Sequence, residues 1–161
     1  MRNTVISLFS GGLDSLGGVS EFLTKLTDNV FLISHRSGQP GTARTQDQLV
    51  KALSASFPNR LQHYKFHCGL TGSRAAEETQ RTRMFLYSSI AVALCAALSQ
   101  KRFFIFENGI TSLNFARRQD LLNGRTTRTT HPKTIHLLQR LFSEIVGAAI
   151  MDFRELPLSL V

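Results

Sequence analysis

The sequence has few cysteines and no recognisable export signal. Its two cysteines, Cys68 and Cys95, stand alone in the chain, which excludes a paired zinc motif and the disulfide framework of a small secreted domain. Residues 1–9 contain no charged segment followed by a longer apolar stretch and a cleavage site of small residues. A reducing, cytoplasmic compartment is therefore expected.

Long apolar runs, internal repeats and low-complexity linkers are also missing. The most apolar stretch, residues 84–98, is shorter than the roughly 18 residues of a membrane-spanning helix and contains Ser88 and Ser89. We expect it to be a buried helix, with no membrane association. The 161 residues are expected to form a single domain, and the abrupt apolar end at residues 156–161 suggests a truncated chain.

Two common nucleotide-binding motifs are absent as well. There is no Gly-Lys dipeptide, which excludes a Walker A loop, and no Gly-x-Gly-x-x-Gly spacing, which argues against hydride transfer. The 19 basic residues, of which 14 are arginines, outnumber the 11 acidic ones and give a net charge of +8. Arginine forms forked contacts with phosphate, so we expect an anionic ligand. The basic residues are scattered, which favours a nucleotide and leaves nucleic acid as a less favoured partner.

Short apolar segments alternate with helical ones, and this pattern predicts an α/β fold. We expect a doubly wound, mostly parallel sheet of five strands with helices on both faces. The expected strands are 5–9, 30–35, 61–67, 103–106 and, more weakly, 151–156. The expected helices are 13–26, 45 to about 56, 75–99 and 132–149.

Local signals set several of these boundaries. Thr45-Gln46-Asp47-Gln48 has the pattern of a capping box, so the second helix is expected to begin at Thr45, after a flexible stretch at 37–41. Pro132 suits the first turn of the last helix, and Thr130 is a candidate cap for it. Residues 108–131 form a polar connection that is longer than most loops and is therefore expected to be functional or mobile.

The strongest chemical signal is the turn between the first strand and the first helix. Gly11 and Gly12 allow the backbone to approach phosphate oxygens, and the helix that follows points its free N–H groups at the same anion. Ser10 and Ser15 are expected to add hydrogen bonds. Asp14 would repel phosphate unless a cation lay between them, so we expect it to be a Mg²⁺ ligand.

The sequence Ser-Gly-Gly-Leu-Asp-Ser at residues 10–15 resembles the PP-loop signature of ATP pyrophosphatases. Within that superfamily the chain looks most similar to 7-cyano-7-deazaguanine synthase and to synthase-like proteins of antiphage defence operons. Residues 9–15, 81–86 and 107–114, together with 128–132, carry this similarity.

The resemblance implies a PP-loop ATP-binding domain with the adenine nucleotide alpha hydrolase-like fold, using ATP and Mg²⁺. The implied reaction is that of a ligase, in which ATP adenylates a 7-deazaguanine carboxylate, pyrophosphate leaves and an amine displaces AMP, as in queuosine biosynthesis. In the defence branch a protein could be the substrate. The synthase carries a cysteine cluster for zinc near its carboxyl terminus, and no cysteine follows Cys95, so zinc is not supported here.

Arg83 and His131 are the further candidates for catalysis. Arg83 begins the buried third helix, where a basic residue opposes the helix dipole, so a role at the nucleotide competes with a solvated first turn. His131 could be a general base or a phosphate donor on a closing loop.

Three more positions are expected to bind substrate, and one to bind the nucleotide. His35 ends the second strand, beside the expected adenosine site. Glu107 and Asn108 follow the fourth strand, at the edge where such sheets bind ligands, although Asn108 could simply form a turn. Arg128 lies in a stretch that carries the resemblance.

Several alternatives remain open at this point. His63 and His67 lack a nearby third ligand and are interpreted as ordinary strand residues, and Cys95 should be inert within its apolar helix. The positive charge also allows a tRNA-modifying PP-loop enzyme. A non-catalytic nucleotide-binding module and a homodimer are further alternatives.

Overall fold

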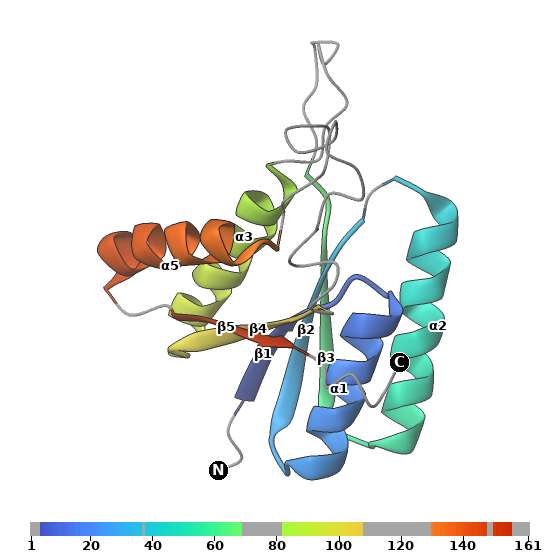
Figure 1. Cartoon of the computed structure of the whole chain (residues 1–161). Helices are drawn as coiled ribbons and strands as arrows, with labels where there is room; N and C mark the ends of the chain where they lie inside the picture. The colour runs from blue at the N-terminus through green and yellow to red at the C-terminus, as the bar shows by residue number, and fades with distance from the viewer. Residues whose placement is uncertain (1–3, 37, 69–81, 108–129, 148–149, 156–161) are drawn as a thin grey trace.

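The computed structural model describes residues 4–36, 38–68, 82–107, 130–147 and 150–155 (Figure 1). Its centre is a sheet of five parallel strands in the order β3-β2-β1-β4-β5. The strands are β1 (Thr4–Leu8), β2 (Asn29–His35), β3 (Leu61–Phe66), β4 (Arg102–Glu107) and β5 (Ile150–Glu155). The chain winds outward from β1 to β3 and then returns to β4 on the other side of β1, so the switch point lies between β1 and β4.

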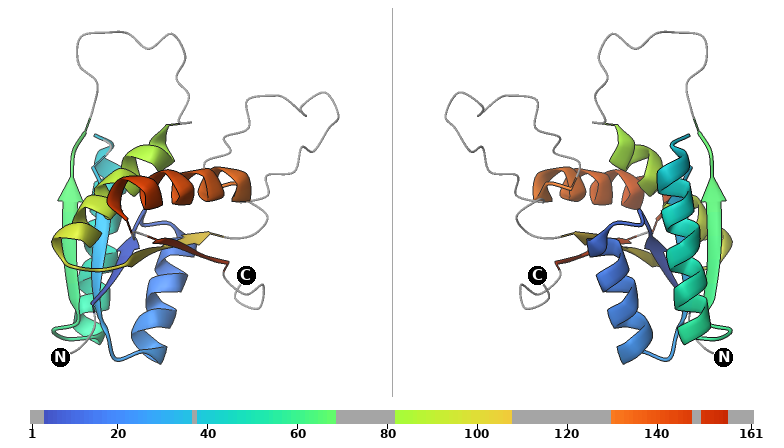
Figure 2. Two further views of the ribbon diagram at one scale, coloured as in Figure 1. Left: turned by 90° about the vertical axis from the view of Figure 1, so that its left-hand side faces the viewer. Right: turned by 90° about the vertical axis from the view of Figure 1, so that its right-hand side faces the viewer.

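Helices cover both faces of this sheet, as Figures 1 and 2 show. One face carries α1 (Leu13–Lys25) and α2 (Pro40–Ser56). The opposite face carries α3 (Arg83–Ala97) and α5 (Pro132–Val146). The prediction of an α/β fold with a parallel sheet between two helical layers is confirmed.

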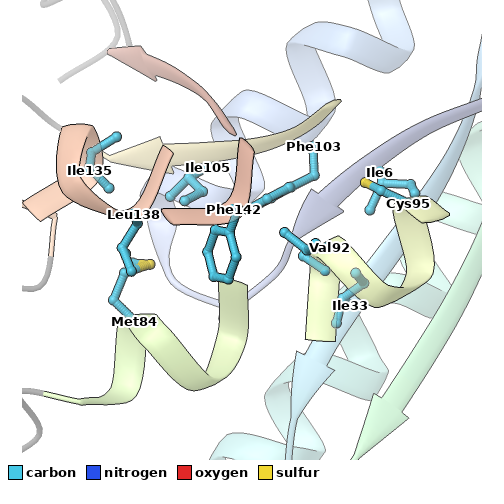
Figure 3. Packing of buried hydrophobic residues seen from close by; sticks show 11 residues of the cluster. Ile6, Ile33, Met84, Val92, Cys95, Phe103, Ile105, Ile135, Leu138 and Phe142 are labelled. Atoms are coloured by element: carbon cyan, nitrogen blue, oxygen red, sulfur yellow. The ribbon is translucent and has the colours of Figure 1, made fainter. Parts of the chain in front are cut away.

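Two hydrophobic clusters fill the space between the layers, because side chains alternate between the faces of a strand. Phe103 and Ile105 of β4 pack with α3 and α5, in the cluster drawn in Figure 3. Phe104 and Phe106 point the other way and pack with Phe22 of α1. Consecutive buried residues on β4 therefore hold both helical layers.

Helix α1 lies unusually close to β4. A Cβ atom built on Gly18 would fall 2.0 Å from the Cγ atom of Phe106, far inside van der Waals contact. The helix can approach the strand only because this position has no side chain.

The helix boundaries correct two details of the prediction and leave a third untested. α2 begins at Pro40 rather than Thr45, because proline is favourable in a first helical turn and Gln39 takes the cap position. α5 ends at Val146, where Gly147 adopts a left-handed conformation with φ of 76°, rather than at residue 149. The expected start of the third helix, 75–81, lies outside the described residues.

Within the described ranges, no helix combines the length and the apolar character needed to cross a membrane.

Candidate functional site

A pocket of about 250 Å³ opens at the carboxyl-terminal edge of the sheet. Strands β1 to β4 all contribute residues at or near their carboxyl ends, and α1, α2 and α3 close the sides. This is the edge, and the switch point, at which open parallel sheets bind ligands. Its polar lining residues are Ser10, Ser15, His35, Thr42, Gln46, Arg83, Tyr87, Glu107 and Thr130.

The turn from Ser10 to Ser15 forms one wall of the pocket. Ser15 is 4% exposed and its hydroxyl donates to the carbonyl of Gly12 at 2.9 Å. The Ser10 hydroxyl accepts from the Gly12 N–H at 3.2 Å and lies 3.1 Å from the Ser15 oxygen. Since Ser15 has already used its only proton, Ser10 must be the donor in that pair.

The cap residue of α1 is Gly12, which has no side chain to bond the N–H groups of the first turn. The N–H groups that begin a helix have no partner within the helix, and they carry the positive end of its dipole. An anion that enters beside Ser10 and Ser15 would meet both. The predicted binding of phosphate at this turn stays a prediction.

Helix α2 secures this turn from the side. Gln46 is 2% exposed, and its Nε2 donates to the carbonyl of Ser10 at 3.0 Å. Gly11 has φ of 83°, and a Cβ atom there would lie 2.9 Å from the Cγ of Gln46. Glycine is therefore required at position 11 for two reasons, the left-handed backbone and the contact with Gln46.

Three side chains on the other side of the pocket form a chain of hydrogen bonds. The Nε of Arg83 donates to the hydroxyl of Tyr87, and its guanidinium lies 5.5 Å from the centre of the Tyr87 ring. The Tyr87 hydroxyl contacts Nδ1 of His35 at 3.3 Å, and Nε2 of His35 contacts the Cys68 carbonyl at 3.1 Å. A carbonyl only accepts, so Nε2 carries the proton, and Tyr87 donates to Nδ1.

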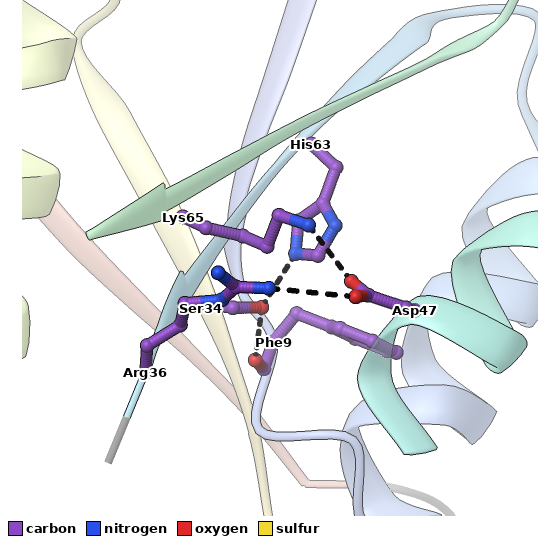
Figure 4. Close-up of polar contacts among 6 residues, drawn as sticks. All are labelled: Phe9, Ser34, Arg36, Asp47, His63 and Lys65. Atoms are coloured by element: carbon purple, nitrogen blue, oxygen red, sulfur yellow. Dashed lines mark hydrogen bonds and ion pairs between the residues drawn. The ribbon is translucent and has the colours of Figure 1, made fainter. Parts of the chain in front are cut away.

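A second network lies behind the Ser10 turn, on β2 and β3 (Figure 4). The buried Ser34 donates to the Phe9 carbonyl at 2.7 Å and contacts Nε2 of His63 at 2.8 Å. Because Ser34 gives its proton to Phe9, His63 must be the donor to Ser34. Burial lowers the pKa of His63, and the charge of Lys65 lowers it further.

An ion-pair group on the surface adjoins this network. Asp47 of α2 pairs with Lys65 at 2.9 Å and with Arg36 at 3.6 Å, as Figure 4 shows. The hydrogen bond from Lys65 holds the pKa of Asp47 below its ordinary value. The group ties α2 to β3 beside the turn.

The structure brings five of the predicted site residues to one pocket. Ser10, Ser15, His35, Arg83 and Glu107 all line it. Their proposed chemical roles stay predictions. Asn108 and Arg128 lie outside the described residues.

Four of the predicted residues that the structure describes do not line the pocket, namely Gly11, Gly12, Asp14 and His131. Gly11 and Gly12 lie in the backbone of the turn between Ser10 and Ser15. His131, proposed as a catalyst, takes the cap position of α5, where its Nδ1 accepts from the N–H of Lys133 at 3.2 Å. His131 therefore caps α5 in place of the expected Thr130, which is 4% exposed and lines the pocket instead. Asp14, proposed as a Mg²⁺ ligand, is not among the lining residues, and among the described residues no group of three or more His, Cys, Asp or Glu could hold a metal.

Four polar residues of the pocket were missed by sequence reasoning, namely Thr42, Gln46, Tyr87 and Thr130. Tyr87 lies in an almost wholly apolar helix, where a tyrosine is readily interpreted as a core residue. Gln46 was assigned to a capping box. The signal for Tyr87 was available, because Arg83 and Tyr87 are four residues apart and must share a face of α3.

Comparison with known proteins relates the chain to others by fold alone. No family model matches it, and neither does any curated protein. The solved structures that resemble it include UDP-glucuronic acid 4-epimerase from Bacillus cereus in complex with NAD, with a TM-score of 0.56 and 11% identity. The same enzyme with UDP-glucuronic acid and NAD gives a TM-score of 0.53 and 12% identity. Each match covers 92% of this chain and 54% or 55% of the epimerase, so the chain spans about half its length.

These findings contradict the prediction of a PP-loop ATP pyrophosphatase related to 7-cyano-7-deazaguanine synthase. The similar structures are NAD complexes of an epimerase, and no family model links the chain to the PP-loop superfamily. The same findings overturn three further expectations: the ATP and Mg²⁺ cofactors, the ligase class and the adenylation of a 7-deazaguanine carboxylate. The physical reason is that a glycine turn between a parallel strand and a helix suits any phosphate, so six residues do not define a reaction.

Proposed function

We propose that this chain is the nucleotide-binding domain of an enzyme, and that it holds the phosphate of a nucleotide on the turn from Ser10 to Ser15. The observation that carries the proposal is the position of this turn. It joins β1 to α1 at the switch point of the sheet and forms a wall of the pocket. The N-terminal end of α1 supplies N–H groups and a positive dipole toward the same place.

The opposite side of the pocket suits the rest of such a ligand. Arg83 carries a positive charge that favours a phosphate or another anion, and Tyr87 and Glu107 offer polar contacts. Enzymes use groups of this kind to stabilise charge and to move protons. We place Ser10, Gly11, Gly12 and Ser15 at the phosphate.

NAD is the first ligand to test, because both similar structures contain it. The sequence lacks the Gly-x-Gly-x-x-Gly spacing associated with dinucleotides, so the panel must be wider. We would titrate the protein with NAD⁺, AMP, UMP and UDP and follow backbone amides by NMR. Saturable shifts at residues 10–15 are expected for at least one of them.

The variant Gly12→Asp separates binding from folding. Aspartate is a favourable helix cap, so α1 should be at least as stable as before, while the new carboxylate repels phosphate. We expect nucleotide affinity to fall by roughly tenfold or more, since a charge-assisted contact contributes about 1.5–3 kcal/mol. The matched control is Asn59→Asp, which makes the same charge change at an exposed residue before β3, at the other edge of the sheet.

Two results would overturn the proposal. One is that no nucleotide of the panel saturates the wild-type protein. The other is that Gly12→Asp binds as tightly as Asn59→Asp.

A further inference from the structure

One polar atom at the pocket has a hydrogen-bonding need that phosphate cannot meet. The Oε1 atom of Gln46 is buried and has no hydrogen-bond partner among the residues that the structure describes. The side chain itself lines the pocket and is 2% exposed. A buried acceptor without a donor destabilises a protein, so a hydrogen-bond donor beyond the described residues is indicated.

The orientation of the Gln46 amide follows from its other end. Nε2 donates to the carbonyl of Ser10 at 3.0 Å. Turning the amide over would set two acceptor oxygens against each other, so the oxygen stays on the side without a partner. The last torsion of a glutamine is soft, and a small rotation can turn Oε1 toward a ligand in the pocket while the contact with Ser10 is kept.

The neighbouring polar groups of the turn do not share this need. Ser10, Gly12 and Ser15 satisfy one another through their hydroxyl, N–H and carbonyl groups. What Gln46 requires is a hydrogen-bond donor, and a fully ionised phosphate has none. The ligand must therefore present a donor close to its phosphate.

We propose that Gln46 accepts a hydrogen bond from a ribose hydroxyl of the nucleotide, and that the site thereby selects ribonucleotides over deoxyribonucleotides. In a nucleotide the ribose is the group joined directly to the phosphate, so its hydroxyls are the donors nearest to the Ser10 turn. This inference rests on the proposed function and specifies the ligand of the same site.

The test is a double-mutant cycle in which one of the two changes is made in the ligand. Wild type and Gln46→Met are titrated with AMP, 2′-deoxy-AMP and 3′-deoxy-AMP, with the matching UMP series, and with purine riboside monophosphate, which lacks the base amine of AMP. In wild type, removal of one of the two hydroxyls should weaken binding roughly five- to tenfold. In Gln46→Met the ribose and deoxyribose forms should bind equally.

Comparing the ratio of ribonucleotide to deoxyribonucleotide affinity in the two proteins separates ligand recognition by Gln46 from its structural contact with Ser10. Loss of its contact with Ser10 would weaken all the nucleotides by the same factor and leave their ratios unchanged. The inference is overturned if Gln46→Met keeps the wild-type preference, or if wild type has no preference at either hydroxyl. It is also overturned if Gln46→Met changes only the preference for AMP over purine riboside monophosphate, because the base amine would then be the donor. Failure of every nucleotide to bind would instead overturn the proposed function, and this inference with it.

Discussion

His63 donates a hydrogen bond from Nε2 to the hydroxyl of Ser34 at 2.8 Å, and Ser34 donates in turn to the carbonyl of Phe9. The chain of contacts crosses from β3 through β2 to the residue before Ser10. It fixes the backbone at the point where the turn from Ser10 to Ser15 begins. The side chains that do this lie behind the pocket and outside its lining.

Substitution Ser34→Ala should destabilise the fold. It leaves the Phe9 carbonyl and the Nε2 proton of His63 without their partner in a buried place, at a cost of about 1–3 kcal/mol. Urea unfolding measures the change. The control is Thr24→Ala, which removes an exposed hydroxyl from α1 and should change stability by less than about 0.5 kcal/mol. Equal effects of the two substitutions would show that the network contributes nothing.

The same network predicts how stability depends on pH. Burial, mainly, lowers the pKa of His63 below its ordinary value of 6.5, so the unfolded chain binds the proton more readily than the folded protein. The free energy of unfolding should then fall as the pH drops from above 6.5 through the folded pKa of His63. It should recover when the pH is raised again. The measurement is the urea midpoint between pH 7.5 and pH 5. In His63→Gln, whose amide can still donate to Ser34, the dependence in this range should be weaker; an unchanged slope would assign it to other groups.

Tyr87→Phe tests the hydrogen-bond chain from Arg83 to His35. The substitution keeps the ring but removes the oxygen that accepts from Arg83 and donates to His35. With Arg83 less well oriented, we expect nucleotide affinity to fall roughly two- to tenfold. Isothermal titration with the best nucleotide of the panel measures it. Tyr64→Phe, which alters a 43% exposed tyrosine on β3, should bind as wild type, and the same affinity in both variants would contradict the assigned role of Tyr87.

Gly18→Ala should be costly because its new methyl group meets Phe106. The Cβ atom would lie 2.0 Å from the ring, so α1 must move away from β4, at a cost of about 1–3 kcal/mol. The control is Gly41→Ala in α2, where a Cβ meets nothing within 4 Å and the change should stabilise the helix by up to about 1 kcal/mol. Urea unfolding of both variants measures these changes in the free energy of unfolding. A Gly18→Ala protein as stable as wild type would mean that α1 does not rest on β4.

The two cysteines should differ sharply in reactivity. Cys68 is exposed, whereas Cys95 is fully buried, and burial raises the pKa of its thiol to about 12. Because the thiolate is the reactive form, the native protein should release one equivalent of thionitrobenzoate from Ellman's reagent at pH 8. A second equivalent should follow only in urea. The control is Cys68→Ser, in which Cys95 is the remaining thiol. Rapid release of thionitrobenzoate by this variant without urea would contradict the burial of Cys95.

The fold could be predicted from the sequence because it depends on the spacing of apolar residues. The unbroken apolar run from Phe103 to Phe106, for example, identifies a strand buried on both faces. The start of α2 could not be predicted in this way. A proline signal at Pro40 competes with a capping-box signal at Thr45, and only packing decides between them. Both signals are local, whereas the choice is made by the whole sheet.

The candidate site also contains a part that could be predicted from the sequence and a part that could not. Ser10 and Ser15 belong to a contiguous turn that the sequence displays. Gln46 reaches that turn from 36 residues further along the chain, and Tyr87 meets His35 across 52 residues. Such contacts have no local pattern, and the reaction cannot be deduced from the turn alone.

The closed set of contacts within the Ser10 turn has a consequence for affinity. Because Ser10 already occupies the N–H of Gly12, an arriving phosphate that takes this N–H must displace a partner rather than fill a gap. Binding there is an exchange of hydrogen bonds, so their number changes little. The gain then comes mainly from charge, and affinity at this turn should increase from monoanionic to dianionic phosphate and decrease as salt is added.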